Sequence, residues 1–123
     1  MTKVLVIEDE ELIRESIVAL LNEREFTAIG TGDGNTGLQL AKGFVPDLIL
    51  CDVRMPGING YEVLEALRQD PTTATIPLIF LTAEAETAEN ILHQGQVMGA
   101  NGYLYKPFTI AQLLEAIATH LQK

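Results

Sequence analysis

Acidic side chains follow two apolar runs of the sequence at the point where each run ends. Glu8 and Asp9 come directly after the run VLVI, and Asp52 comes directly after LILC. If both runs are strands of one parallel sheet, their carboxyl ends lie at the same edge and bring three carboxylates into one pocket. Carboxylates this close repel one another, and some would be protonated unless a cation is present. Oxygen ligands with room for water suit Mg²⁺, so the pattern predicts a magnesium site.

Two further polar residues follow apolar runs in the same way. Thr82 comes after LIFL, and Lys106 comes after GYLY and before Pro107. A carboxylate at a strand end can act as a nucleophile toward phosphorus and form an aspartyl phosphate. That transfer needs positive charge and hydrogen-bond donors around the phosphoryl oxygens, which Mg²⁺, an ammonium and a hydroxyl can supply. The four strand ends together therefore indicate phosphoryl-transfer chemistry.

Each of these residues also has a simpler interpretation. Acidic residues after a strand often only interact favourably with the dipole of the following helix. A single Asp, Thr or Lys at a strand end is commonly a helix cap or a solvated tip. The interpretation as a site rests on co-location, because independent strand ends contribute complementary chemistry.

Five runs have the length and composition of β-strands. Three of them, VLVI, LILC and LIFL, are apolar at every position, as expected for strands buried on both faces of a parallel sheet. The second run, FTAIG, is more mixed, which favours a place near the edge. The predicted strands are Val4–Ile7, Phe26–Gly30, Leu48–Cys51, Leu78–Leu81 and Gly102–Tyr105.

Helical patterns fill the segments between and after these strands. The first and last helices carry apolar stripes at helical spacing. Capping-box spacing marks the starts of the third and fifth helices, at Asn59 with Glu62 and at Thr109 with Gln112. The stripes are Ile13, Ile17, Leu20 and Leu21 in the first helix, and Ile110, Leu113, Leu114, Ile117 and Leu121 in the last.

The second and fourth helices have weaker patterns, near Asn35–Lys42 and near Glu86–Met98. Strict alternation of strand and helix predicts parallel strands joined by right-handed crossovers, with helices on both faces of the sheet. The predicted fold class is therefore α/β, with a doubly wound five-stranded sheet.

Composition limits the functions that the chain can have. Its 123 residues suit one domain, expected over 1–123, and 47% of them are apolar. A net charge of −9 argues against direct binding of nucleic acid or an anionic membrane surface. The single cysteine, Cys51, lies within an apolar run and is expected to be a buried hydrophobe. No membrane-spanning run and no secretory signal pattern is present, so a reducing, cytoplasmic setting is expected.

The residues around the strand ends resemble a known family. The segments are Ile7-Glu8-Asp9-Glu10, Leu50-Cys51-Asp52-Val53-Arg54-Met55-Pro56-Gly57 with Gly60 beyond, Leu81-Thr82-Ala83, and Gly102-Tyr103-Leu104-Tyr105-Lys106-Pro107-Phe108. With these four segments in this order, the chain resembles a CheY-like response-regulator receiver domain of two-component signalling over nearly its whole length. The resemblance implies a flavodoxin-like (βα)5 fold with strand order 2-1-3-4-5.

The resemblance also implies a role for each strand-end residue and a cis peptide bond between Lys106 and Pro107. The protein would be a phosphorylation-dependent switch rather than a turnover enzyme. The implied roles are phosphoacceptor for Asp52, direct Mg²⁺ ligand for Asp9, ligand through water for Glu8, backbone-carbonyl ligand for Arg54, phosphoryl contacts for Lys106 and Thr82, and aromatic switch residue for Tyr103.

The partners implied by the resemblance are a sensor histidine kinase or phosphotransfer protein as phosphodonor, and an output domain or effector protein. Output, or homodimerisation, would use the face made by the fourth helix, fifth strand and fifth helix. Lys106 lies 24 positions after Thr82, about two more than the family pattern, and the excess falls before Gly95. Arg54 and Glu84 are expected to flank the approach of the hydrolytic water, with the small Ala83 admitting small phosphodonors.

Three other classes fit less well. A phosphatase or mutase with an aspartyl nucleophile commonly has a second acid two residues later, where this chain has Arg54. A flavodoxin-like cofactor binder would need a phosphate-binding loop after the first strand, and Glu8-Asp9 would repel phosphate there. A degenerate receiver that binds partners without phosphorylation would not need so complete a set of site residues.

Overall fold

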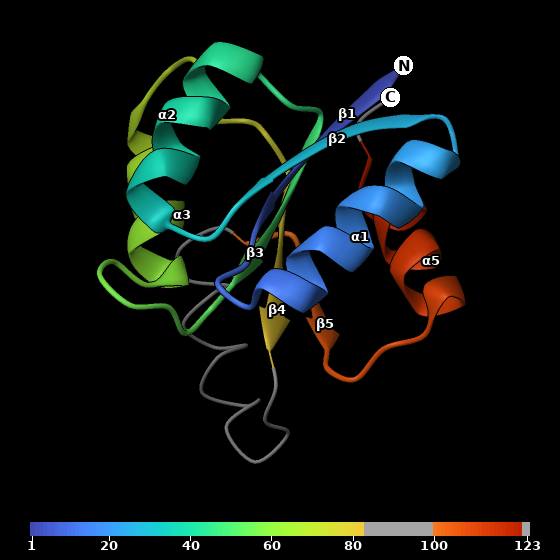
Figure 1. Cartoon of the computed structure of the whole chain (residues 1–123). Helices are drawn as coiled ribbons and strands as arrows, with labels where there is room; N and C mark the ends of the chain where they lie inside the picture. The colour runs from blue at the N-terminus through green and yellow to red at the C-terminus, as the bar shows by residue number, and fades with distance from the viewer. Residues whose placement is uncertain (83–99, 122–123) are drawn as a thin grey trace.

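The structure is a computed structural model that describes residues 1–82 and 100–121. Five parallel strands form one sheet in the order β2-β1-β3-β4-β5, as the resemblance implied (Figure 1). The strands are β1 (Thr2–Ile7), β2 (Phe26–Thr31), β3 (Leu48–Asp52), β4 (Leu78–Thr82) and β5 (Gly102–Tyr105).

Burial explains the composition of the strands. Every residue of β3 and β4 is buried, whereas β2 lies at an edge of the sheet and is mostly half-buried, as its mixed sequence predicted. The observed strands β3 and β4 are one residue longer than predicted. They include Asp52, which pairs with Leu81, and Thr82, which pairs with Tyr105. Two expected site residues are therefore the last residues of buried strands, held by the sheet itself.

Helices cover both faces of the sheet. α2 (Gly34–Phe44) and α3 (Gly60–Gln69) lie on one side, and α1 (Glu11–Glu23) and α5 (Ile110–His120) lie on the other (Figure 1). Alternate residues of the strands point to opposite faces and divide the core in two. One half includes Leu5, Ile7, Ile49, Cys51, Leu64, Leu67 and Phe80, and the other includes Val4, Val6, Ile17, Leu21, Leu50, Leu113 and Ile117.

The predicted helix starts are confirmed at α3 and α5, where Asn59 and Thr109 each begin a complete capping box. α2 is longer at both ends than its predicted span, 35–42. Its start has a cap that the sequence analysis missed, since the carboxylate of Asp33 accepts a hydrogen bond from the backbone N–H of Thr36 at 3.0 Å.

The helix predicted near Glu86–Met98 and the length difference before Gly95 lie outside the described residues. In the part of the chain that the structure describes, none of the helices has the length and hydropathy to cross a membrane.

Candidate functional site

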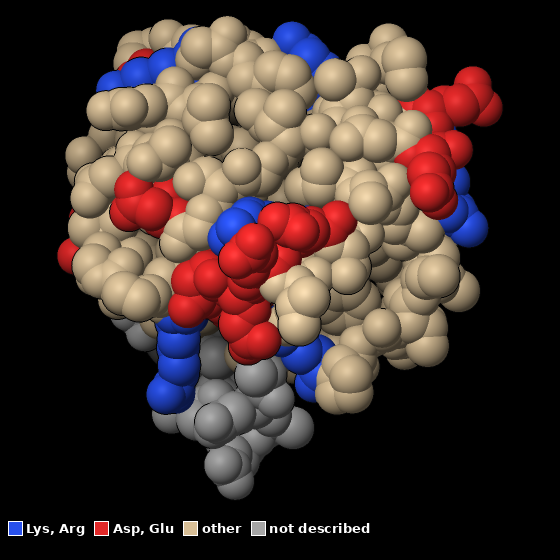
Figure 2. Space-filling model, viewed as in Figure 1, with Lys and Arg blue, Asp and Glu red and all other residues tan. Residues whose placement is uncertain are grey.

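The carboxyl ends of the strands bring the three predicted carboxylates together. Glu8 and Asp9 follow β1, Asp52 ends β3, and one oxygen from each lies within 4.8 Å of the others. Glu8 is fully buried and Asp52 is 7% exposed. Figure 2 shows acidic side chains gathered on the surface over the start of α1, next to this buried pair. The molecule therefore has a concentrated negative charge at one edge of the sheet.

Lys106 supplies positive charge to this pocket. Its ammonium lies 2.6 Å from Oε1 of Glu8 and 3.5 Å from Oδ2 of Asp52. Its backbone N–H donates to the carbonyl oxygen of Thr82 at 2.7 Å, which holds the residue against the end of β4. The peptide bond to Pro107 is cis, as the resemblance implied. One ammonium thus faces two of the three clustered carboxylates.

A cleft of about 170 Å³ opens over these groups. Thr82 lies at the end of β4 with only 4% of its surface exposed, and Arg54 is exposed. Glu84, the expected partner of Arg54 at the mouth, lies outside the described residues, so that pairing stays a prediction. The cleft is lined by Asp9, Glu10, Asp52, Val53, Arg54, Thr82 and Lys106.

Crowding changes the acidity of the pocket. Burial, reinforced by the negative charge of Glu8, raises the pKa of Asp52 from 3.8 to about 7, although Lys106 opposes the shift. Burial alone would lower the pKa of Lys106, but its close contact with the Glu8 carboxylate and the charge of Asp52 outweigh burial and raise the pKa. Lys106 therefore stays protonated near neutral pH, and its positive charge only partly offsets the rise in the pKa of Asp52.

The donor set fits a hard divalent cation. Oε2 of Glu8 accepts a hydrogen bond from the backbone N–H of Glu10 at 3.1 Å. Oε1 is buried and has only the Lys106 ammonium, as an ion-pair partner, among the described groups. Three carboxylates beside an open cleft match the oxygen ligands and retained waters of Mg²⁺. A bound cation would offset the repulsion that raises the pKa of Asp52.

Glycine at position 60 brings α3 close to the backbone of Asp52. A Cβ at Gly60 would clash with the backbone carbonyl oxygen of Asp52. The Gly60 N–H donates to the carbonyl of Val53 at 2.8 Å, and Gly57 turns the intervening segment with a positive φ of 79°. The spacing of Gly57 and Gly60 after Asp52 therefore shapes the rim of the cleft.

Tyr103 lies on β5 opposite Phe80, two residues before the register partner of Thr82. Its half-buried ring is 5.9 Å from that of Phe80, which in turn contacts Tyr61 edge-on at 5.4 Å. Burial raises the pKa of both tyrosines. The sequence analysis assigned no role to Tyr61, and its place in this aromatic row could not be read from spacing.

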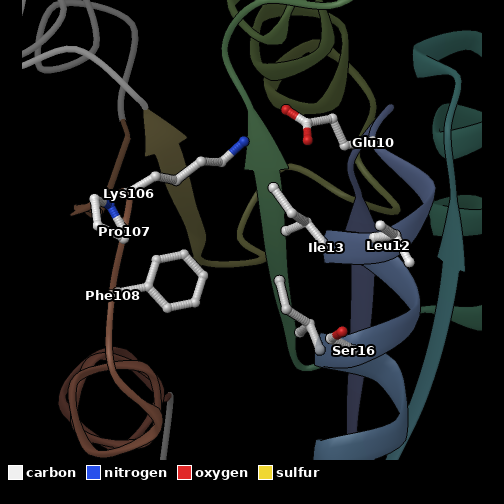
Figure 3. A pocket seen from close by; sticks show the side chains of 8 residues that line it. Glu10, Leu12, Ile13, Ser16, Lys106, Pro107 and Phe108 are labelled. Carbon is white, nitrogen blue, oxygen red and sulfur yellow. The ribbon is translucent and has the colours of Figure 1, made fainter.

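An apolar hollow of about 590 Å³ adjoins the acidic cleft (Figure 3). Side chains of α1 form one wall, and Pro107 and Phe108 form the other, while Glu10 and Lys106 line both the hollow and the cleft. Leu12, on the rim, is 82% exposed although it is large and apolar. The sequence analysis missed this feature, because Leu12 is off the buried stripe of the first helix. The lining residues are Glu10, Leu12, Ile13, Ser16, Ile17, Lys106, Pro107 and Phe108.

The fold and the acidic cleft are typical of a receiver domain, the domain found in two-component response regulators. A family model for the response regulator receiver domain matches residues 4–118, and the chain belongs to that family. Among solved structures, the chain is similar to the Vibrio cholerae chemotaxis protein CheY4, with a TM-score of 0.91 and 30% identity over 98% of this chain and 99% of that one. A putative response regulator from Chloroflexus aurantiacus gives a TM-score of 0.87 and 31% identity, with 96% and 95% of the two chains covered.

Curated relatives are longer proteins. The response regulator ArlR of Staphylococcus saprophyticus is 37% identical over the whole of this chain, which spans 54% of its length. The DNA-binding response regulator MtrA of Mycolicibacterium paratuberculosis is 31% identical over 98% of this chain and 52% of its own length. The chain thus matches about half of each relative, and DNA binding is a property named for that whole regulator.

Proposed function

We propose that this receiver domain accepts a phosphoryl group on Asp52 in a Mg²⁺-dependent reaction and acts as a signalling switch. One observation carries the proposal: the oxygens of Glu8, Asp9 and Asp52 lie within 4.8 Å of one another, beside the Lys106 ammonium and under an open cleft. Residues 1–123 would act as one unit in this role.

Asp9, Asp52 and the carbonyl of Arg54 would hold Mg²⁺ directly, with Glu8 acting through water. The bound ion would supply positive charge to the carboxylates and to the phosphoryl oxygens. An Asp52 oxygen forms the new bond to phosphorus while the donor's phosphorus–nitrogen bond breaks, and that electron pair leaves with the donor's imidazole. Lys106 pairs with the transferred group, and the Thr82 hydroxyl donates to it.

The chain would catalyse only its own phosphotransfer and dephosphorylation. Arg54 is exposed on the lining of the cleft, where it can obstruct the water that attacks phosphorus. We expect Arg54→Ala to shorten the lifetime of the phosphorylated protein in a phosphate-release time course. A decay rate equal to that of the wild type would show that Arg54 does not gate hydrolysis.

The phosphodonor would be a sensor histidine kinase or a phosphotransfer protein, docked on the apolar hollow of Figure 3. The hollow shares Glu10 and Lys106 with the acidic cleft, so a partner seated there can present a phosphohistidine to Asp52. Exposed Leu12 would contribute apolar contact area to that complex.

The surface that transmits the signal would include β5, α5 and the segment between β4 and β5. It would contact an output domain, an effector protein or a second copy of the chain. The net charge of −9 opposes direct contact between this part and nucleic acid, and the proposed setting is the cytoplasm.

Intact mass after treatment with acetyl phosphate tests the phosphoacceptor. The wild type should gain one phosphoryl group in the presence of Mg²⁺, and Asp52→Asn should gain none. Asp33→Asn is the matched control, because it removes an exposed carboxylate that caps α2. Labelling that persists in Asp52→Asn, or in excess EDTA, would refute the proposal.

A further inference from the structure

Arg14 makes a contact that the proposed chemistry does not use. It lies in the first part of α1 and is half-buried, and its guanidinium Nη1 donates to the backbone carbonyl oxygen of Glu8 at 2.9 Å. Its own backbone N–H donates to the carbonyl oxygen of Glu10, also at 2.9 Å. One residue is thus bonded to both ends of the segment 8–10, which carries two of the three clustered carboxylates.

The carbonyl that Arg14 binds belongs to the peptide bond between Glu8 and Asp9. Because a peptide group is planar, holding its oxygen sets the direction in which the chain continues to Asp9. On the other side, the Glu8 N–H donates to the carbonyl of Thr31 in β2 at 2.9 Å. Repulsion among the carboxylates works to spread the pair, and these two hydrogen bonds oppose that movement.

Two glycines at the end of β2 make room for this arginine. A Cβ at Gly32 would lie 2.6 Å from Nη1 of Arg14, and a Cβ at Gly30 would lie 3.0 Å from its Cγ. The guanidinium therefore occupies space that only the absence of a side chain at position 32 leaves open. The Cβ at Gly32 would also lie 3.6 Å from the Cα of Asp9. The two glycines and the acid pair therefore border the same arginine side chain.

We propose that Arg14 is a positioning residue for the magnesium site, fixing the Glu8–Asp9 peptide so that both carboxylates are in place before the ion binds. The inference rests on the proposed function, since it takes these carboxylates as Mg²⁺ ligands. Residues that orient metal ligands from outside the coordination shell typically change metal affinity by about 10–100-fold when they are replaced. Arg14→Met keeps the side-chain stem and removes the donor, so it should weaken Mg²⁺ binding by about 10-fold.

Gly32→Ala provides a second, independent perturbation. Its added methyl group displaces the guanidinium and leaves the positive charge on the protein, so a loss of affinity in this variant cannot come from net charge. Arg24→Met is the matched control, because Arg24 is exposed at the other end of α1 and carries the same charge. It should bind Mg²⁺ as the wild type does.

Calorimetric titration with Mg²⁺ alone, together with thermal melts in EDTA, tests the inference on the intact chain. Arg14→Met and Gly32→Ala should each weaken Mg²⁺ binding. The double variant should bind Mg²⁺ no more weakly than the single variant with the lower affinity, because both changes remove the same contact between Arg14 and the Glu8 carbonyl. Wild-type affinity in either folded variant, with only a lower melting temperature in EDTA, would overturn the role of Arg14 and leave the magnesium site standing. Absence of Mg²⁺ binding in the wild type would overturn the proposed site itself, and the role of Arg14 with it.

Discussion

Replacing Asp52 with Asn should stabilise the metal-free protein. Burial and the charge of Glu8 raise the pKa of Asp52 from 3.8 to about 7, so the folded state resists ionisation of this carboxyl group. The stability that its protonated form provides is fully present below pH 3.8 and is lost as the pH rises through about 7. Above that pH, Asp52 is charged in the folded state, although water solvates this carboxylate better in the unfolded chain.

The pKa difference sets the size of the effect. At about 1.4 kcal/mol for each pKa unit, the rise corresponds to about 4 kcal/mol above pH 7. This value already includes the attraction of Lys106, which lies 3.5 Å away. Water entering the cleft screens part of the charge, so we expect Asp52→Asn to raise the free energy of unfolding by about 2–4 kcal/mol at pH 8.

Urea unfolding in EDTA, followed by circular dichroism, measures this gain. It should shrink as the pH is lowered from 8 toward 4, because the wild-type carboxyl group then becomes protonated. Asp33→Asn should instead lower the free energy of unfolding at pH 8. Hydrogen bonds from Thr36 lower the pKa of Asp33 and make its charged form favourable in the folded state. An Asp52→Asn variant no more stable than the wild type at pH 8, or equally stabilised at every pH, would refute the reasoning.

Three further predictions follow from the same pocket. Mg²⁺ should raise the melting temperature of the wild type but not that of the Glu8→Gln, Asp9→Asn double variant; an equal rise would place the ion elsewhere. Lys106→Met should lower the free energy of unfolding by about 3 kcal/mol in EDTA, because it leaves buried carboxylates unpaired; an unchanged urea midpoint would contradict this. Beryllofluoride should shift NMR signals of both Thr82 and Tyr103 in the wild type; shifts confined to the acid pocket would contradict a coupled switch.

The sequence alone predicted the five parallel strands and the gathering of Glu8, Asp9 and Asp52 at their carboxyl ends. Runs such as VLVI and LILC are apolar at every position because their strands are buried on both faces of the sheet. This pattern can be recognised in the sequence without knowledge of the tertiary structure. Parallel strands end at one edge, so Asp52 and Glu8 could be placed together from their positions after these runs. The helix starts at Asn59 and Thr109 were readable because a capping box is local.

Contacts between distant segments were decided only by the tertiary structure. The sequence predicted that Lys106 would lie at the pocket. Its ammonium lies closer to Glu8 than to Asp52, and this depends on how β5 ends beside β4. The raised pKa of Asp52 depends on burial, and the extent of burial cannot be read from the spacing of residues in the sequence. The hydrogen bond from Arg14 to the Glu8 carbonyl depends on the room left at Gly32, a residue on another strand end. Side-chain type and spacing determine which groups reach one edge of a sheet, whereas distances, desolvation and close packing arise only when separate segments meet in space.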